Sequence, residues 1–151
     1  MFKKILIPVD GSAGSSLVVE HCLELLQNIR ADRVTLLHLA FMPGQLQSYS
    51  GKMGRSYAEI KEQLEKHGEE ILGKAAERFA EKNVPAVVET KLMWDDPPYA
   101  IVREAREGGY DLIIMGSRGM GGLESLLMGS VSNHVAHHAE CTVMLVKKKR
   151  K

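Results

Sequence analysis

Cysteine, long apolar runs and an excess of one charge are all scarce in this chain. The sequence has two cysteines, and 20 basic residues stand against 19 acidic ones. Two cysteines, Cys22 and Cys141, do not make a disulfide framework, and they fit a reducing compartment. The balanced charge gives no overall field that would attract nucleic acid or a membrane surface. With neither a signal segment nor a membrane-length apolar stretch, the chain is expected to act in the cytoplasm.

Length and composition favour one domain. A chain of 151 residues with 44% hydrophobic content buries about two-thirds of its unfolded surface, enough for a core without metal or disulfides. We expect one α/β domain over residues 1–146. The basic segment Lys147-Lys-Lys-Arg-Lys151 is then a tail, more typical of a solvated end than of a contact with nucleic acid or anionic lipid.

Short apolar runs alternate with helical patterns five times. Strands are predicted over 4–9, 34–39, 84–92, 111–115 and 142–146, and helices over 15–27, 57–81, 97–107 and 130–138. Asp96 is expected to cap the third helix, with Pro97 at its first position and Gly108-Gly109 at its end. Apolar strands separated by helices predict a doubly wound parallel sheet covered on both faces. Ligands bind such sheets beyond the carboxyl ends of the strands, where the winding reverses.

One glycine pattern follows the fourth predicted strand. Gly116 and Gly119 are separated by two residues, and after nine more come Gly129 and Ser130. A strand that leads through glycines into a helix start can hold an anion, because backbone N–H groups approach it without a Cβ in the way. The pattern lacks the lysine of a Walker loop and the spacing of a dinucleotide fingerprint. The structural alternative is that these glycines only allow the chain to turn. Their spacing, and their place between a strand and a helix, favour a phosphate site.

Several segments together resemble the universal stress protein family. They are Ile7-Pro-Val-Asp-Gly-Ser12, Leu36-Leu-His-Leu39, Asp96-Pro97, and the segment from Asp111 to Gly119 together with Gly129-Ser130-Val131-Ser132. The glycine pattern is similar to the ATP-binding motif of that family in every fixed position. The resemblance therefore implies the ATP-binding subgroup, and it implies the strand order 3-2-1-4-5, which places the first and fourth strands side by side.

The same resemblance implies a set of nucleotide-binding residues. Pro8 and Asp10 would border the adenosine, Leu39 would offer backbone groups to the adenine edge, and Met115 and Gly116 would line the pocket. Phosphates would lie against Gly119, Gly129, Ser130, Val131 and Ser132, with Mg²⁺ or Mn²⁺ bridging them. Arg118 either pairs with a phosphate or stays solvated. Asp10 has a structural alternative as a cap on its own turn.

Other polar residues favour structural interpretations. His134, His137 and His138 have helical spacing, but no carboxylate or cysteine cluster completes a metal site, so none is predicted. His38 in an apolar strand is expected to be a hydrogen-bonded core residue. Trp94 fits packing at a hinge and contact with a partner about equally.

The function expected from this reading is that of a nucleotide-dependent regulatory module in a stress response. Its alternatives are a slow ATP hydrolase or phosphotransferase, and a nucleotide-independent dimeric scaffold. Glu124 is the only carboxylate in the glycine loop, and the loop has no lysine, so no catalytic residue is assigned. The fifth strand, at the edge of the implied sheet, predicts a homodimer. The regulatory protein partner is not identified by the sequence.

Overall fold

The computed structural model describes residues 2–42, 56–118 and 128–148. Its strands are β1 (Phe2–Pro8), β2 (Ala31–Ala40), β3 (Val87–Trp94), β4 (Leu112–Gly116) and β5 (Thr142–Val146). Its helices are α1 (Ala13–Leu26), α3 (Tyr57–Glu81), α4 (Pro97–Glu107) and α5 (Ser130–His138). Within these residues no helix combines the length and the apolar character needed to span a membrane.

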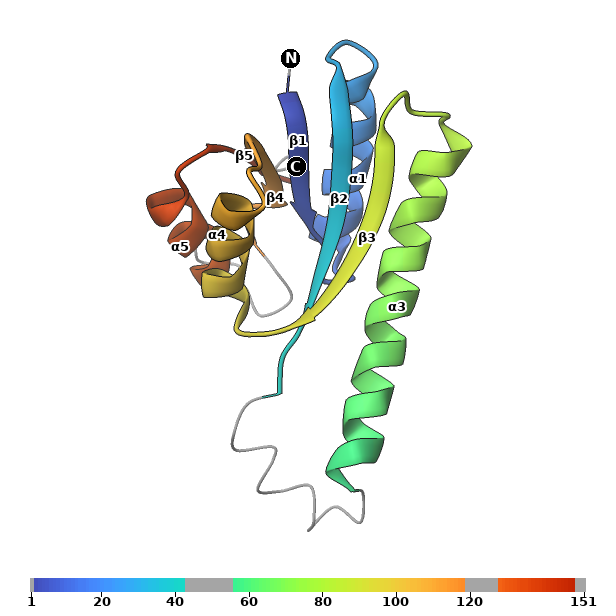
Figure 1. The fold of residues 1–151 in the computed structure, drawn as a ribbon, viewed down its shortest axis with the longest axis vertical. Coiled ribbons are helices and arrows are strands. Elements are labelled where there is room, and N and C mark those ends of the chain that lie inside the picture. Colours follow the sequence, from blue (N-terminus) through green and yellow to red (C-terminus); the bar gives the residue numbers. More distant parts are fainter. Residues whose placement is uncertain (1, 43–55, 119–127, 149–151) are drawn as a thin grey trace.

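The five strands form one parallel sheet in the order β3-β2-β1-β4-β5. This confirms the fold class and the strand order. Helices α1 and α3 cover one face of the sheet, and α4 and α5 cover the other (Figure 1). Because side chains alternate along a strand, neighbouring residues of β1 supply both cores: Ile5 and Ile7 pack toward α1 and α3, whereas Leu6 packs toward α4 and α5.

The helix ends follow local chemistry. Ser12 caps α1 by accepting a hydrogen bond from the Ser15 N–H at 3.2 Å. Asp96 occupies the cap position of α4 with Pro97 next to it, as predicted, but its side chain makes no capping bond. Gly109 follows the end of α4 with a φ of +66°, a conformation that favours glycine.

Several predicted strand bounds need correction, and the second strand begins at Ala31 and not at Val34. The third strand begins at Val87 and not at Val84, because Pro85 has no N–H and the Ala86 N–H donates to the Val84 carbonyl at 2.8 Å, which makes a turn. Cys141 is only partly buried, whereas Cys22 is fully buried, and burial raises the pKa of the Cys22 thiol to about 12.

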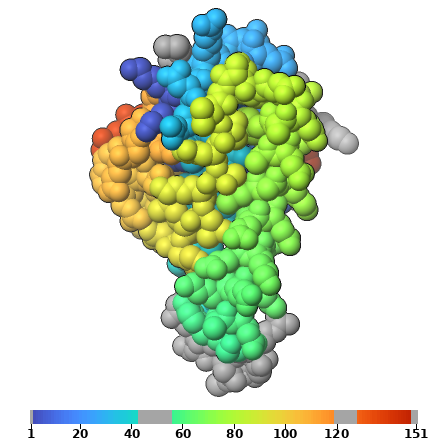
Figure 2. All heavy atoms as spheres, turned by 45° about the vertical axis from the view of Figure 1, so that its right-hand side comes forward, coloured from blue at the N-terminus to red at the C-terminus, as the bar shows by residue number. Residues whose placement is uncertain are grey.

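Helix α3 extends past the carboxyl ends of the strands, and its first turns project from the body of the molecule (Figures 1 and 2). Trp94, at the end of β3, fastens this part of the helix. Its Nε1–H donates to Glu65 Oε1 at 2.8 Å, and the Lys61 ammonium lies 5.5 Å from the ring centroid. Trp94 therefore packs within the chain.

Two glycines of α3 give a matched test of this packing. A Cβ added at Gly68 would lie 2.6 Å from His38 Cδ2 and 2.8 Å from Leu92 Cδ1, whereas one at Gly73 would have nothing within 4 Å. Gly73→Ala should raise the free energy of unfolding by up to about 1 kcal/mol through helix propensity. Gly68→Ala should lower it by about 1–3 kcal/mol through overpacking. Urea unfolding of both variants checks this, and equal stabilisation by both would contradict the tight approach of α3.

Candidate functional site

The hydrogen-bonded pairing of β1 with β4 ends just before Pro8, a residue that has no N–H. β1 pairs with β4 only as far as Leu6 opposite Ile113, whereas its pairing with β2 continues to Pro8 opposite Leu37. The Val9 N–H donates to the Leu37 carbonyl at 2.8 Å, so the alternation of a strand turns the main chain of Pro8 toward β4. Proline cannot donate there, and the ladder ends. We call the space beyond this point the β1–β4 crevice.

Asp10 lies where the chain leaves β1. Its Oδ1 accepts hydrogen bonds from the Ser12 N–H at 2.9 Å and from Ser15 Oγ at 2.6 Å, and its own N–H donates to Ser15 Oγ at 2.8 Å. Gly11, between them, has a φ of +80°. The structural alternative for Asp10, a cap on its turn, is therefore present. These hydrogen bonds do not test the contact of Asp10 with a ribose hydroxyl, which stays a prediction.

Met115 and Gly116 end β4, and Gly116 is closely approached by backbone. A Cβ on Gly116 would lie 3.2 Å from the Arg118 carbonyl oxygen, and one on Gly14 of α1 would lie 3.1 Å from the same atom. A side chain at either glycine would therefore press against the Arg118 carbonyl oxygen, where the α1 start passes close to the residues after β4. Arg118 is half-buried, and its predicted use on a phosphate stays a prediction.

The start of α5 lies beside the end of β4, where the Gly129 N–H donates to the Ser117 carbonyl. Gly129 is the cap residue of α5 and has no side chain to bond the first N–H groups of the helix. The first intrahelical bond runs from the Asn133 N–H to the Gly129 carbonyl at 2.9 Å, which leaves the N–H groups of Ser130, Val131 and Ser132 without helical acceptors. Together with the helix dipole they make an anion-binding end.

The side chain of Ser132 has a structural partner. Its side chain is buried, and its hydroxyl donates to the Ser117 carbonyl at 2.6 Å. The Gly129 N–H donates to the same carbonyl at 2.6 Å. A hydroxyl has one hydrogen to give, so in this conformation only the backbone N–H of Ser132 is left for a phosphate. The side chain fastens the α5 start to the end of β4.

Leu39 lies near the carboxyl end of β2, on the strand next to β1. It is partly buried and its side chain packs toward α4 and α5. Because the Leu37 carbonyl accepts from β1 and the Ala40 carbonyl accepts from the Asp95 N–H on the β3 side at 3.1 Å, the main chain of Leu39 points toward β1. That direction agrees with the predicted contact between Leu39 backbone groups and an adenine edge.

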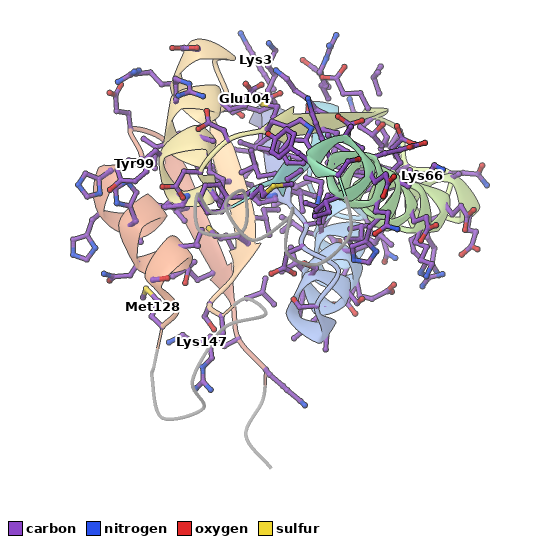
Figure 3. The ribbon with its side chains drawn as sticks, turned by 90° about the horizontal axis from the view of Figure 1, so that it is seen from below. Lys3, Lys66, Tyr99, Glu104, Met128 and Lys147 are labelled. Atoms are coloured by element: carbon purple, nitrogen blue, oxygen red, sulfur yellow. The ribbon has the colours of Figure 1, made fainter. Side chains whose placement is uncertain are left out.

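The structure therefore gathers most of the predicted residues at one end of the sheet. Figure 3 looks onto this end, where Met128, just before α5, and Lys147, just after β5, lie on the same side. Gly119 and Glu124 lie outside the described residues, so nothing is added to their predicted roles.

The residues that sequence reasoning missed are those that hold the candidate site together and do not face the β1–β4 crevice. Ser15 orders Asp10, Gly14 admits the Arg118 carbonyl, and Ser117 ties β4 to α5. A signal existed for Ser15 alone, since Asp-Gly-Ser followed by serines is turn chemistry. The other two depend on contacts between distant segments.

Several polar groups outside the crevice have structural partners. Asp95 pairs with Arg103 and accepts from the Asp96 N–H at 2.7 Å. The Arg103 guanidinium, and then this N–H, hold the pKa of the Asp95 carboxyl below its usual value. The rings of His134 and His138 stack with centroids 4.1 Å apart. Across the described ranges, no three His, Cys, Asp or Glu side chains are grouped to hold a metal ion.

Comparisons with known proteins agree with this architecture. The family model described as the universal stress protein family matches residues 1–147. The universal stress protein YxiE of Bacillus subtilis is 33% identical over 153 residues, covering 97% of this chain and 100% of that protein. The universal stress protein MJ0531 of Methanocaldococcus jannaschii is 32% identical over 151 residues, covering 100% of this chain and 85% of that protein.

Solved structures show the same fold. The structure of the M. jannaschii protein MJ0577 superposes with a TM-score of 0.80 at 29% identity, covering 100% of this chain and 99% of that one. A family member from Arabidopsis thaliana with AMP bound has a TM-score of 0.66 at 21% identity, over 97% of this chain and 92% of that one. The fold, the match over nearly the whole length and the two relatives above 30% identity show that this chain belongs to the universal stress protein family.

Proposed function

We propose that this protein is an ATP-binding regulatory module of a cytoplasmic stress response. ATP would lie in the β1–β4 crevice, with its base against β2 and its phosphates at the start of α5. Nucleotide occupancy would change what the protein can bind. The partner that responds to it would be another protein and not nucleic acid or a membrane.

The observation that carries the proposal is the ladder break at Pro8 opposite an uncapped helix start. The break leaves main-chain groups between the two strands outside the ladder, and the α5 start presents the N–H groups of Ser130, Val131 and Ser132 at the same end of the sheet. A triphosphate needs such donors, and a nucleoside needs the space beside them.

Nucleotides bound to other family members support the ligand class. Universal stress proteins of this fold have been solved with AMP, with cAMP and with dAMP bound. The choice of ATP rests on the glycine pattern of this chain, which is similar to the ATP-binding motif of the family. When bound with ATP, Mg²⁺ or Mn²⁺ would neutralise charge between phosphate oxygens.

Regulation is favoured over catalysis by the chemistry of the donors. The groups that the described part of the site presents are mainly backbone N–H groups, which bind charge but neither accept a proton nor position a nucleophile. Phosphoryl transfer needs a group that orients the attacking oxygen and cations on the γ-phosphate. Hydrolysis is therefore expected to be slow, and a nucleotide-independent scaffold is disfavoured because the cradle residues are present.

The first test concerns the proposed phosphate site at the start of α5. Gly129→Val should abolish micromolar ATP binding, because the side chain would occupy the place of a phosphate. Ser130→Ala, which keeps every backbone N–H, should weaken binding by no more than about 1 kcal/mol, or about fivefold. Isothermal titration with ATP and Mg²⁺ measures both variants. Wild type that is folded and gives neither heat nor competition by ATP analogues would refute ATP binding.

The second test separates module from enzyme. Wild type with ATP and Mg²⁺ should release phosphate far more slowly than the enzyme median of about 10 per second. The measurement is steady-state phosphate release, with Glu124→Gln as the matched variant. Rapid release that disappears in Glu124→Gln while ATP still binds would make the protein an ATP hydrolase.

We also propose a homodimer through β5. This strand lies at the sheet edge, and Met144 is 37% exposed. Antiparallel pairing of two β5 strands about a two-fold axis would satisfy the free N–H and C=O groups of both edges.

The direction of the β5 main chain decides which variant tests the dimer. The Ser117 N–H donates to the Val146 carbonyl at 3.0 Å. The N–H and C=O groups of Val146 and Met144 therefore point toward β4, whereas those of Val143 and Leu145 point toward the open edge of the sheet. Proline at Met144, the substitution that edge pairing alone suggests, would break the inner ladder instead of the dimer contact.

Val143→Pro should therefore give a monomer that keeps its fold, because it removes one outward donor. Met144→Pro should mainly lower the free energy of unfolding. Light scattering at tens of micromolar, with urea unfolding of the same samples, distinguishes the two. A monomeric mass for wild type at ordinary salt would exclude this interface.

A further inference from the structure

We propose that His38 is a positioning residue that keeps the main chain of Leu39 free to recognise the nucleotide base. The inference rests on the proposed function, because it concerns how the crevice selects its ligand. It concerns a residue whose side chain faces away from the crevice.

The hydrogen-bonding pattern of a parallel sheet gives the first step. After the Val9 N–H has bonded the Leu37 carbonyl, a regular ladder would continue from the Leu39 N–H to the Val9 carbonyl. The pairing of β1 with β2 stops one step earlier, at Pro8 opposite Leu37. Within the described residues, no backbone hydrogen bond joins Val9 to Leu39.

The imidazole of His38 takes the missing place. Its Nδ1 lies 2.8 Å from the Val9 carbonyl oxygen. A carbonyl oxygen only accepts, so Nδ1 carries the hydrogen and donates it. The Val9 carbonyl oxygen thus bonds the His38 side chain, and among the described residues the Leu39 N–H, which faces the β1 side, makes no ladder bond to it. The C=O of Leu39 points to the same side, because both groups of one strand residue share a direction.

The ring is held from the other side by α3. A Cβ at Gly68 would lie 2.6 Å from His38 Cδ2 and 3.2 Å from Nε2, so the helix packs directly on the imidazole. The contact leaves little room for the ring to turn away from Val9. Helix α3 thus fixes His38, and His38 fixes the end of β1.

A free N–H beside a free C=O selects among purines. Adenine offers an acceptor at N1 and a donor at its amino group, which complement this pair. Hypoxanthine offers a donor at N1 and an acceptor at O6, so both contacts would be mismatched. Sites that hydrogen-bond a ligand reject analogues that leave their polar groups unpaired. The geometry points to adenine over hypoxanthine nucleotides.

The experiment compares three probes on four proteins. The probes are ATP, inosine triphosphate and inorganic tripolyphosphate, each with Mg²⁺, and the readout is the dissociation constant from calorimetry. His38→Phe keeps an aromatic ring without the donor. His38→Asn keeps an N–H donor on Cγ. Val34→Ala, at a fully buried position of β2, destabilises the same strand without touching Val9 or Leu39.

Wild type should prefer ATP to inosine triphosphate by roughly tenfold or more. His38→Phe should lose about five- to tenfold in ATP affinity, the effect of one hydrogen bond, with tripolyphosphate binding unchanged. His38→Asn should restore the preference for ATP, and Val34→Ala should retain it.

Amide exchange gives a readout without ligand. The Leu39 N–H should exchange fast in wild type and slowly in His38→Phe, where it regains the Val9 carbonyl.

Outcomes against the inference differ from those against the proposed function. If ATP binds and is preferred, but His38→Phe keeps that preference, the role of His38 is refuted and ATP binding stands. Equal affinity of wild type for ATP and inosine triphosphate also refutes it. If wild type binds none of the three probes, the proposed function fails and the inference fails with it.

Discussion

The missing N–H of Pro8 is the constraint on which the rest of the site depends. Strands β1 and β4 are neighbours in the sheet, yet their ladder ends at Leu6 opposite Ile113, just before the proline. One more ladder step would fill the space in which a ligand can lie. The topology brings the two strands together, and a single residue type decides where they separate.

What surrounds this opening is mostly main chain held by side chains that face elsewhere. The Asp10 turn is closed by Ser15, the α5 start is tied to Ser117 through Ser132, and the end of β1 is held by His38. Each of these side chains makes its hydrogen bonds to other groups of the protein. Backbone donors are thereby fixed in advance, and binding does not have to order them.

Much of this arrangement was predictable from sequence, for physical reasons. Apolar strands between amphipathic helices define the layers, and helices α3 and α5 have the predicted bounds. The glycine pattern located the loop after β4. The start of β3 was mispredicted because Pro85 redirects one N–H. The sequence did not predict the close contacts at Gly14 and Gly68 or the hydrogen bond of His38 to Val9. Each of them depends on two segments that are distant in sequence and meet only in the fold.

A site made of backbone donors has a consequence for regulation. Peptide N–H groups do not titrate near neutral pH, so they remain hydrogen-bond donors across that range, in contrast with a histidine or a low-pKa thiol. The main-chain donors at the start of α5 and on β2 are of this kind. Occupancy would then follow the nucleotide concentration itself. That property would suit the proposed regulatory module better than an enzyme, whose groups must exchange protons during each turnover.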